Sequence, residues 1–262
     1  MGFIFNKKLI VAAWCLAGSS LLVADNVVVP GASGNVWQSW QTSQLSNQVW
    51  SNSSPSRPYW DNQSWDGPND NIGDCLALTS SGCKIPNQPG NLPYLGQSSG
   101  KAFNNFYFQS TGGGTVTMQV QVAGDAAYDE FGWYNIDNLH QYQVLFDGKT
   151  SANTTVSFTP SADYGLFFLN DAPGQDDVYL SQSSLSPTDA DFQHFAVFEQ
   201  SPGTYYIGME DLPSCNTDFD YNDMVVKLST SSVPEPASFL LLGSGLLGIG
   251  ALRFRRQKNA VE

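Results

Sequence analysis

The sequence predicts an all-β protein whose main part is a β-sandwich or jelly-roll-like domain, and three observations support that class. From Val116 to Val122 every second residue is apolar and the residues between them are polar, as in a strand with one buried face. Gly, Pro, Asn and Asp separate further short apolar segments at a spacing of roughly ten residues, which is typical of such folds. Between residues 25 and 232 no segment has a long apolar period of 3.6 residues, so we expect no long helix there.

The expected strands follow one another through residues 96–228, which we take as the β-sandwich domain. The strand at 115–122 follows the turn Gly112-Gly113-Gly114. The other expected strands are residues 103–109, 131–136, 142–146, 154–158, 164–169, 192–198, 204–209 and 224–228. Residues 25–95 differ because they are rich in Ser, Asn, Gln, Pro and Trp. We expect them to form loops and a few strands on the same core, with a separate flexible region as the alternative.

The N-terminus has the features of a secretory signal peptide. Lys7 and Lys8 precede an apolar stretch at residues 9–23, and Leu22-Val23-Ala24 is an acceptable small-residue cleavage site. We therefore expect residues 1–24 to form a signal helix that is removed on export. The chain from Asp25 onward then reaches an oxidising compartment outside the inner membrane.

The C-terminus contains a second apolar segment, which ends in a basic tail. Residues 237–252 carry no charge, and as a helix they would span about 24 Å, somewhat less than the roughly 30 Å hydrocarbon core. Arg253 and Arg255 extend this span by snorkelling, and with Arg256 they are expected to stay cytoplasmic. A buried core helix is the alternative, which the basic tail disfavours. We therefore expect residues 237–262 to be a transmembrane helix and its tail, after a linker at 229–236.

The residues around this helix resemble the PEP-CTERM sorting signal of Gram-negative bacteria. The resemblance rests on Val233, Pro234, Glu235 and Pro236, on the Gly- and Leu-rich helix, and on Arg253, Arg255 and Arg256. It implies processing by an exosortase-type enzyme, a precursor tethered to the inner membrane, and delivery to the outer surface or extracellular matrix. It also implies an association with exopolysaccharide, whose production such systems accompany.

The expected mature part of the chain is strongly acidic. Residues 25–232 contain five Lys and Arg against 22 Asp and Glu, a net charge of −17, compared with −13 for the whole chain. Such a surface repels nucleic acid and anionic lipid, so we expect no nucleic-acid partner. It attracts cations, divalent cations above all, although solubility alone is the alternative explanation.

Cysteine usage indicates at most one short disulfide loop. Cys75 and Cys83 flank the turn-forming stretch Thr79-Ser80-Ser81-Gly82, and we expect them to pair. Cys215 is left over, either free or as the partner of one of these two. No Cys-x-x-Cys pair or Cys/His cluster supports a zinc site.

The segment from Glu210 to Asp223 carries the strongest chemical pattern. The residues that we take as candidate metal ligands are Glu210, Asp211, Asp218, Asp220, Asn222 and Asp223. Carboxylates packed this closely repel one another unless a cation joins them, and Ca²⁺ takes six to eight oxygen ligands. The spacing of Asp218, Asp220 and Asn222 is that of the first half of an EF-hand loop, but Asp223 stands where that loop needs Gly. Capping of tight turns by Asp and Asn side chains is the alternative.

The same segment resembles the Glu-Asp-Leu…Asp-x-Asp-Tyr-Asn-Asp signature of a domain of unknown function that is common in bacterial surface proteins. The resemblance extends to Phe131-Gly132-Trp133-Tyr134 and to Thr204-Tyr205-Tyr206-Ile207. It implies a β-sandwich with a Ca²⁺ role and no established catalysis.

Two other function classes stay open at this point. Trp37, Trp40, Trp50, Trp60 and Trp65 could form a carbohydrate-binding platform, or they could supply core to a segment with few Leu and Ile. A glycosidase would need two carboxylates in a cleft about 5–10 Å apart. The two histidines, His140 and His194, offer little to a catalytic triad. A non-enzymatic, Ca²⁺-stabilised surface protein is the prediction that we carry forward.

Overall fold

We describe a computed structural model of the chain, over residues 24–39, 58–61, 71–77, 83, 85, 92–124 and 126–230. The predicted signal peptide, apart from its last residue, the sorting motif and the C-terminal helix lie outside these described residues. Among the helices in the described part, none is long and apolar enough to cross a membrane.

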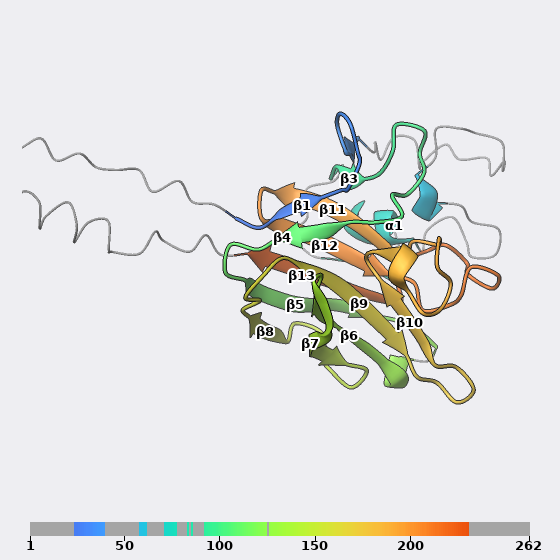
Figure 1. Cartoon of the computed structure of the whole chain (residues 1–262). Coiled ribbons are helices and arrows are strands. Elements are labelled where there is room, and N and C mark those ends of the chain that lie inside the picture. The colour runs from blue at the N-terminus through green and yellow to red at the C-terminus, as the bar shows by residue number, and fades with distance from the viewer. Residues whose placement is uncertain are drawn as a thin grey trace, which may run out of the picture. The chain divides into compact units, whose positions relative to one another are not determined.

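The described part is all-β, as predicted, and its strands form two antiparallel sheets (Figure 1). Sheet A has the order β1-β4-β9-β6-β7, with β10 paired to β9. Its strands are β1 (Asn26–Val28), β4 (Tyr107–Gln109), β6 (Asp129–Asn135), β7 (Asn138–Asp147), β9 (Tyr164–Asn170) and β10 (Asp177–Leu180).

Sheet B has the order β2-β3-β11-β12-β13-β5-β8. Its strands are β2 (Trp37–Gln38), β3 (Tyr94–Leu95), β5 (Gly114–Gln121), β8 (Thr155–Phe158), β11 (Phe195–Ser201), β12 (Thr204–Met209) and β13 (Met224–Thr230). The helices in the described part are short: η2 (Tyr59–Asp61), α1 (Ile72–Ala77), η3 (Ala126–Tyr128) and η4 (Ser183–Leu185).

One hydrophobic core lies between the sheets, because alternate residues of facing strands point into it. Phe131 and Trp133 of β6 contribute from sheet A, and Tyr205, Ile207 and Met209 of β12 contribute from sheet B. All five side chains are buried.

A β-bulge corrects the predicted pattern of the strand at 115–122. Val116 and Met118 face the main core, but Val226 pairs with Met118 and Val225 with Val120, so Gln119 is skipped in the register with β13. The extra residue turns Val120 to the opposite face of sheet B, where it packs on a second apolar cluster. Val122 is 48% exposed. The prediction of one continuous buried face from Val116 to Val122 is therefore wrong after Met118.

Other strand boundaries also differ from the predicted ones. The segments expected at 103–109 and 192–198 become strands only from Tyr107 and Phe195 onward, whereas β7 begins four residues before the expected Tyr142. The strands β1, β2, β3 and β10 and the helix α1 were not predicted. All of these elements are short. For β1, β2 and β3, pairing with a segment distant in the sequence decides whether so short a stretch becomes a strand.

Within residues 25–95, β1 joins sheet A and β2 and β3 join sheet B, while η2, α1 and the described residues near them cover the outer face of sheet B. Trp60 is buried against Tyr94 and Phe198, and Ile72 and Leu76 of α1 belong to the same cluster. A disulfide joins Cys75 to Cys83 at this position, while Cys215 is an exposed free thiol.

The described tryptophans of this region are packed rather than presented to solvent. Trp60 is buried, and Trp37 stacks on Tyr205 with the ring centroids 6.0 Å apart. Trp40, Trp50 and Trp65 lie outside the described residues. For the two that are described, the role is core packing.

Candidate metal centre

The acidic segment connects two paired strands, and this pairing brings its ends together. Glu210 and Asp211 follow β12 directly, and Asp223 directly precedes β13. Met209 is paired with Met224 in the antiparallel register, so Glu210 and Asp223 face each other at the same end of the sheet. The backbone N–H of Asp211 donates to the Asp223 carboxylate at 2.8 Å, which closes the connection.

The loop between these ends is held in an unusual conformation by its neighbours. Phe219 and Tyr221 have positive φ angles of 62° and 53°, a region that non-glycine residues rarely adopt. The Tyr221 ring is buried and its hydroxyl donates to the Gln193 carbonyl at 2.7 Å. The first N–H of α1, that of Ile72, donates to the carbonyl of Asp220 at 2.8 Å. These contacts fix the direction in which the Asp220 side chain points.

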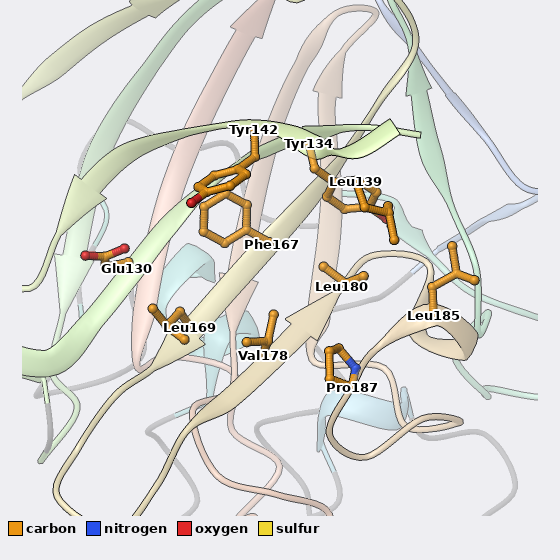
Figure 2. A pocket seen from close by; sticks show the side chains of 10 residues that line it. All are labelled: Glu130, Tyr134, Leu139, Tyr142, Phe167, Leu169, Val178, Leu180, Leu185 and Pro187. Atoms are coloured by element: carbon orange, nitrogen blue, oxygen red, sulfur yellow. The ribbon is translucent and has the colours of Figure 1, made fainter. Parts of the chain in front are cut away.

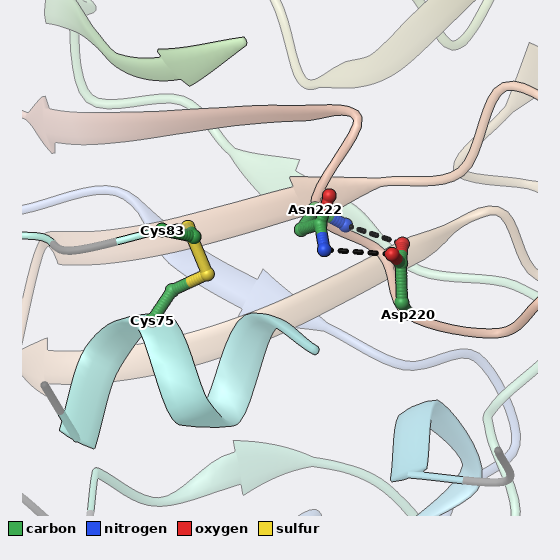
Figure 3. Close-up of a disulfide and its surroundings, with 4 residues drawn as sticks. All are labelled: Cys75, Cys83, Asp220 and Asn222. Atoms are coloured by element: carbon green, nitrogen blue, oxygen red, sulfur yellow. Dashed lines mark hydrogen bonds between the residues drawn. A yellow bond between two sulfur atoms is a disulfide. The ribbon is translucent and has the colours of Figure 1, made fainter. Parts of the chain in front are cut away.

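Asn222 holds the Asp220 carboxylate from within the loop. Its backbone N–H donates to Oδ1 of Asp220 at 3.0 Å and its side-chain amide donates to Oδ2 at 2.6 Å. Figure 3 shows both bonds, with the disulfide of α1 in the same region. Asn222 therefore acts as a donor to Asp220 through its backbone and side-chain nitrogens, whereas an Asn binds a hard cation through its side-chain oxygen.

Three carboxylates converge on one small volume. One oxygen atom from each of Glu210, Asp220 and Asp223 lies within 4.8 Å of the other two. Two oxygens bound to one Ca²⁺ at about 2.4 Å cannot be more than about 5 Å apart, so this grouping has the dimensions of a calcium site. Asp220 is buried, while Asp223 remains partly open to solvent and so offers an ion a route inward.

Glu210 is the most unusual member of the group. Its side chain is 0% exposed, and neither carboxylate oxygen accepts a hydrogen bond of normal geometry. Buried polar groups almost always have such a partner, and a buried unpaired carboxylate is costly. Glu210 is therefore a buried acid whose carboxylate oxygens lack a hydrogen bond of normal geometry.

The electrostatics agree with this geometry. Burial raises the pKa of Glu210 to about 9, assisted by the charges of Asp218, Asp220 and Asp211, while the Thr217 hydroxyl acts in the opposite direction. Burial and the charge of Glu210 also raise the pKa of Asp223 well above its ordinary value, against the N–H of Asp211. Without a cation, Glu210 keeps its proton at neutral pH, and proton binding by Asp223 is favoured by the same burial and mutual repulsion.

The other proposed ligands lie around the group without joining it. The carbonyl of Asp211 accepts from the Asn170 amide at 3.2 Å and from the Tyr179 hydroxyl at 3.4 Å. Asp218 is only partly buried, and it affects the group through its charge on Glu210. Of the five Asp and Glu residues proposed from the sequence, Glu210, Asp220 and Asp223 converge.

His194 positions Glu210, a role that the sequence does not indicate. The Nδ1 atom of His194 lies 3.0 Å from the Glu210 carbonyl oxygen, and Nε2 lies 3.2 Å from Asp189. Its ring stacks on Tyr179 at a centroid distance of 3.4 Å, and burial lowers its pKa to about 4. Asp189 in turn accepts from the N–H and the hydroxyl of Ser214, which belongs to the acidic loop. His194 and Asp189 are separated from the loop in sequence, and no local motif indicates their role.

The fold and this centre define an all-β protein with a buried acidic group at one end of a sheet. Comparison with known families places two matches on the chain. Residues 126–231 match the family described as Domain of unknown function (DUF4114), and residues 232–256 match the PEP-CTERM protein-sorting motif. The first match includes the acidic loop, but it does not confirm the specific motif from Asp218 to Asp223. No curated protein and no solved structure matches the chain significantly.

The matches say more about how the protein is exported and processed than about its activity. A PEP-CTERM motif implies processing by an exosortase, and hence a secreted or cell-surface protein with a membrane-anchored precursor. Neither matched family is a catalytic one.

Proposed function

We propose that this chain is a non-enzymatic secreted or cell-surface protein whose β domain binds Ca²⁺ through Glu210, Asp220 and Asp223. The observation that carries the proposal is the fully buried Glu210 carboxylate, which accepts no hydrogen bond of normal geometry and has one oxygen within 4.8 Å of an oxygen from each of Asp220 and Asp223. Bound Ca²⁺ would supply the missing positive charge and lock the end of β12 to the start of β13.

The chemistry of the group favours a hard cation. All three converging side chains offer carboxylate oxygens, and neither Cys nor His belongs to the group. Oxygen-only sites suit Ca²⁺ or Mg²⁺, whereas Zn²⁺ prefers nitrogen and sulfur. The loop also provides backbone carbonyls and a solvent-facing side, which suits the larger and less regular shell of Ca²⁺.

The burial of the group argues against catalysis at this place. A glycosidase places its two carboxylates on either side of an accessible sugar bond. Glu210 has no exposed surface with which to touch a substrate. A small ion that enters past Asp223 satisfies this geometry better than a polysaccharide does.

Direct titration tests the proposal. We expect the purified protein to bind one Ca²⁺ per chain by isothermal titration calorimetry, with weaker binding of Mg²⁺. Asp223→Asn should reduce the affinity at least about tenfold, the equivalent of 1.4 kcal/mol. Asp171→Asn, which makes the same charge change at an exposed loop residue, is the control and should bind like the wild type. Binding that survives Asp223→Asn unchanged would place the ion elsewhere.

We further propose that the processed protein associates with the extracellular matrix or exopolysaccharide; the sorting motif at residues 232–256 supports the export and processing that this requires. A variant lacking Pro234, Glu235 and Pro236 should accumulate in the inner-membrane fraction, because the processing enzyme can no longer recognise its tail. The wild type should be recovered from the matrix fraction of the same cells. Equal recovery of both proteins from the matrix would contradict the proposal.

A further inference from the structure

The outer face of sheet A, away from the core between the sheets, carries a pocket that the acidic centre does not use. Its volume is about 310 Å³, within the range of small-molecule sites. Side chains from β6, β7, β9 and β10 line it together with residues at and after η4 (Figure 2).

Two glycines give this pocket its aromatic floor. A Cβ atom on Gly132 would collide with the ring of Phe167, and one on Gly165 would collide with the ring of Tyr134. Because both positions are glycine, the two rings lie down on the sheet instead of standing away from it. The hydroxyl of Tyr134 donates to Gln182 at 3.1 Å, which fixes that ring further. The floor is therefore preorganised rather than formed on binding.

The rim of the pocket exposes large apolar side chains to water. Tyr142 is 62% exposed and meets the Phe167 ring edge-on at 5.8 Å. Leu139 and Leu185, which lie at the end of the pocket away from Glu130 (Figure 2), are 44% and 46% exposed. A concave site lined mainly by apolar and aromatic side chains, with a single charged group, has the composition of a small-molecule site.

One end of the pocket is acidic. Glu130 is the charged residue in the lining, and it lies at the end to which the Tyr142 hydroxyl points (Figure 2). Asp147 is its direct cross-strand partner in β7, so the two carboxylates lie on the same face of the sheet. Neither forms an ion pair with a Lys or Arg side chain among the described residues, although Asp147 accepts hydrogen bonds from the Lys149 N–H and the Thr150 hydroxyl in the turn after β7. Two like charges directly across a strand pair repel, and a bound cation would relieve this repulsion.

We propose that this pocket binds a small amphiphile with an apolar body and a cationic head. The apolar body lies on the floor formed by Phe167 and Tyr134, and the head lies beside Glu130. The aromatic rings add to the preference for a cation, because the ring faces of Tyr and Phe attract ammonium groups. The acidic character of the whole chain works in the same direction and disfavours an anionic head.

Three probes with the same eight-carbon body test both parts of this proposal. They are octyltrimethylammonium, octanol and octanoate, titrated below their aggregation limits into the full chain in EDTA and followed by protein NMR. We expect the cation to bind about tenfold more tightly than octanol, in line with a desolvated cation–π and charge contact. Octanoate should bind most weakly. Equal affinities for all three, or no binding at all, would overturn the proposal.

Matched variants locate the site. Glu130→Gln should bring the affinity for the cation close to that for octanol and leave octanol binding unchanged. Leu139→Ser should weaken all three probes together. Val122→Ser removes a side chain of similar exposure outside the pocket and should change nothing. An equal loss in Leu139→Ser and Val122→Ser, or an unaltered cation preference in Glu130→Gln, would show that the probes bind elsewhere.

Discussion

Adding Ca²⁺ to the metal-free protein is expected to raise its thermal unfolding midpoint by about 5–11 °C. A ligand that binds only the folded state adds about 2.7 kcal/mol when its free concentration is one hundred times its Kd. In a domain of this size, 1 kcal/mol shifts the midpoint by about 2–4 °C. Differential scanning calorimetry in EDTA and in millimolar Ca²⁺ measures the difference.

Glu210→Gln should remove this Ca²⁺ response and leave the metal-free protein intact. The substitution keeps the shape of the side chain but deletes the buried acid whose neutral form the metal-free fold requires. At pH 8 and in EDTA the variant should therefore be no less stable than the wild type. Asp171→Asn, with the same change in charge, should keep the full response. If Glu210→Gln retained the rise in midpoint, Glu210 would have no part in ion binding.

The second large effect concerns pH. In EDTA, the midpoint is expected to fall as the pH rises from 6.5 to 9. Unfolded Glu has lost its proton by pH 6.5, whereas folded Glu210 keeps its proton up to about pH 9, and the pKa of Asp223 is raised as well. The folded state thus binds more protons, and stability falls by about 1.4 kcal/mol per pH unit for each extra proton.

Other groups with shifted pKa values act outside this pH window. The pKa of His194 is lowered to about 4, so the folded state resists its protonation, and stability is lost as the pH falls below 6.5. Buried tyrosines such as Tyr134, whose pKa is raised to about 12, affect stability only above pH 10.

Calorimetry at several pH values should show a fall in the unfolding midpoint between pH 6.5 and 9 that Ca²⁺ suppresses, because the ion replaces the protons. Glu210→Gln should make the fall shallower. A midpoint that rises between pH 6.5 and 9 in EDTA would contradict the assignment.

Several features of the fold could be predicted from the sequence because they depend on local pattern. The strand at 204–209 has the predicted bounds, and the all-β class follows from short alternating segments divided by turn residues. The sorting motif is also local, which explains why a family match covers the region in which its residues were recognised.

The bulge at Gln119 shows where local pattern fails. The alternation through Val122 is real in the sequence, but pairing with β13 skips one residue, and every later side chain changes face. A shift of one residue in register is invisible in the strand's own composition. The floor of the outer pocket depends in the same way on Gly132 and Gly165 meeting rings from neighbouring strands.

By itself, the sequence determined the all-β class, the acidity of the chain and the segment in which its carboxylates gather. Only the tertiary structure decided that Glu210, Asp220 and Asp223 converge, that Asn222 donates to Asp220, and that Glu210 is buried without a hydrogen bond of normal geometry. The physical reason is that composition and spacing are properties of one segment. Burial and convergence arise from β12, β13, α1 and the His194 region, which are brought together by packing.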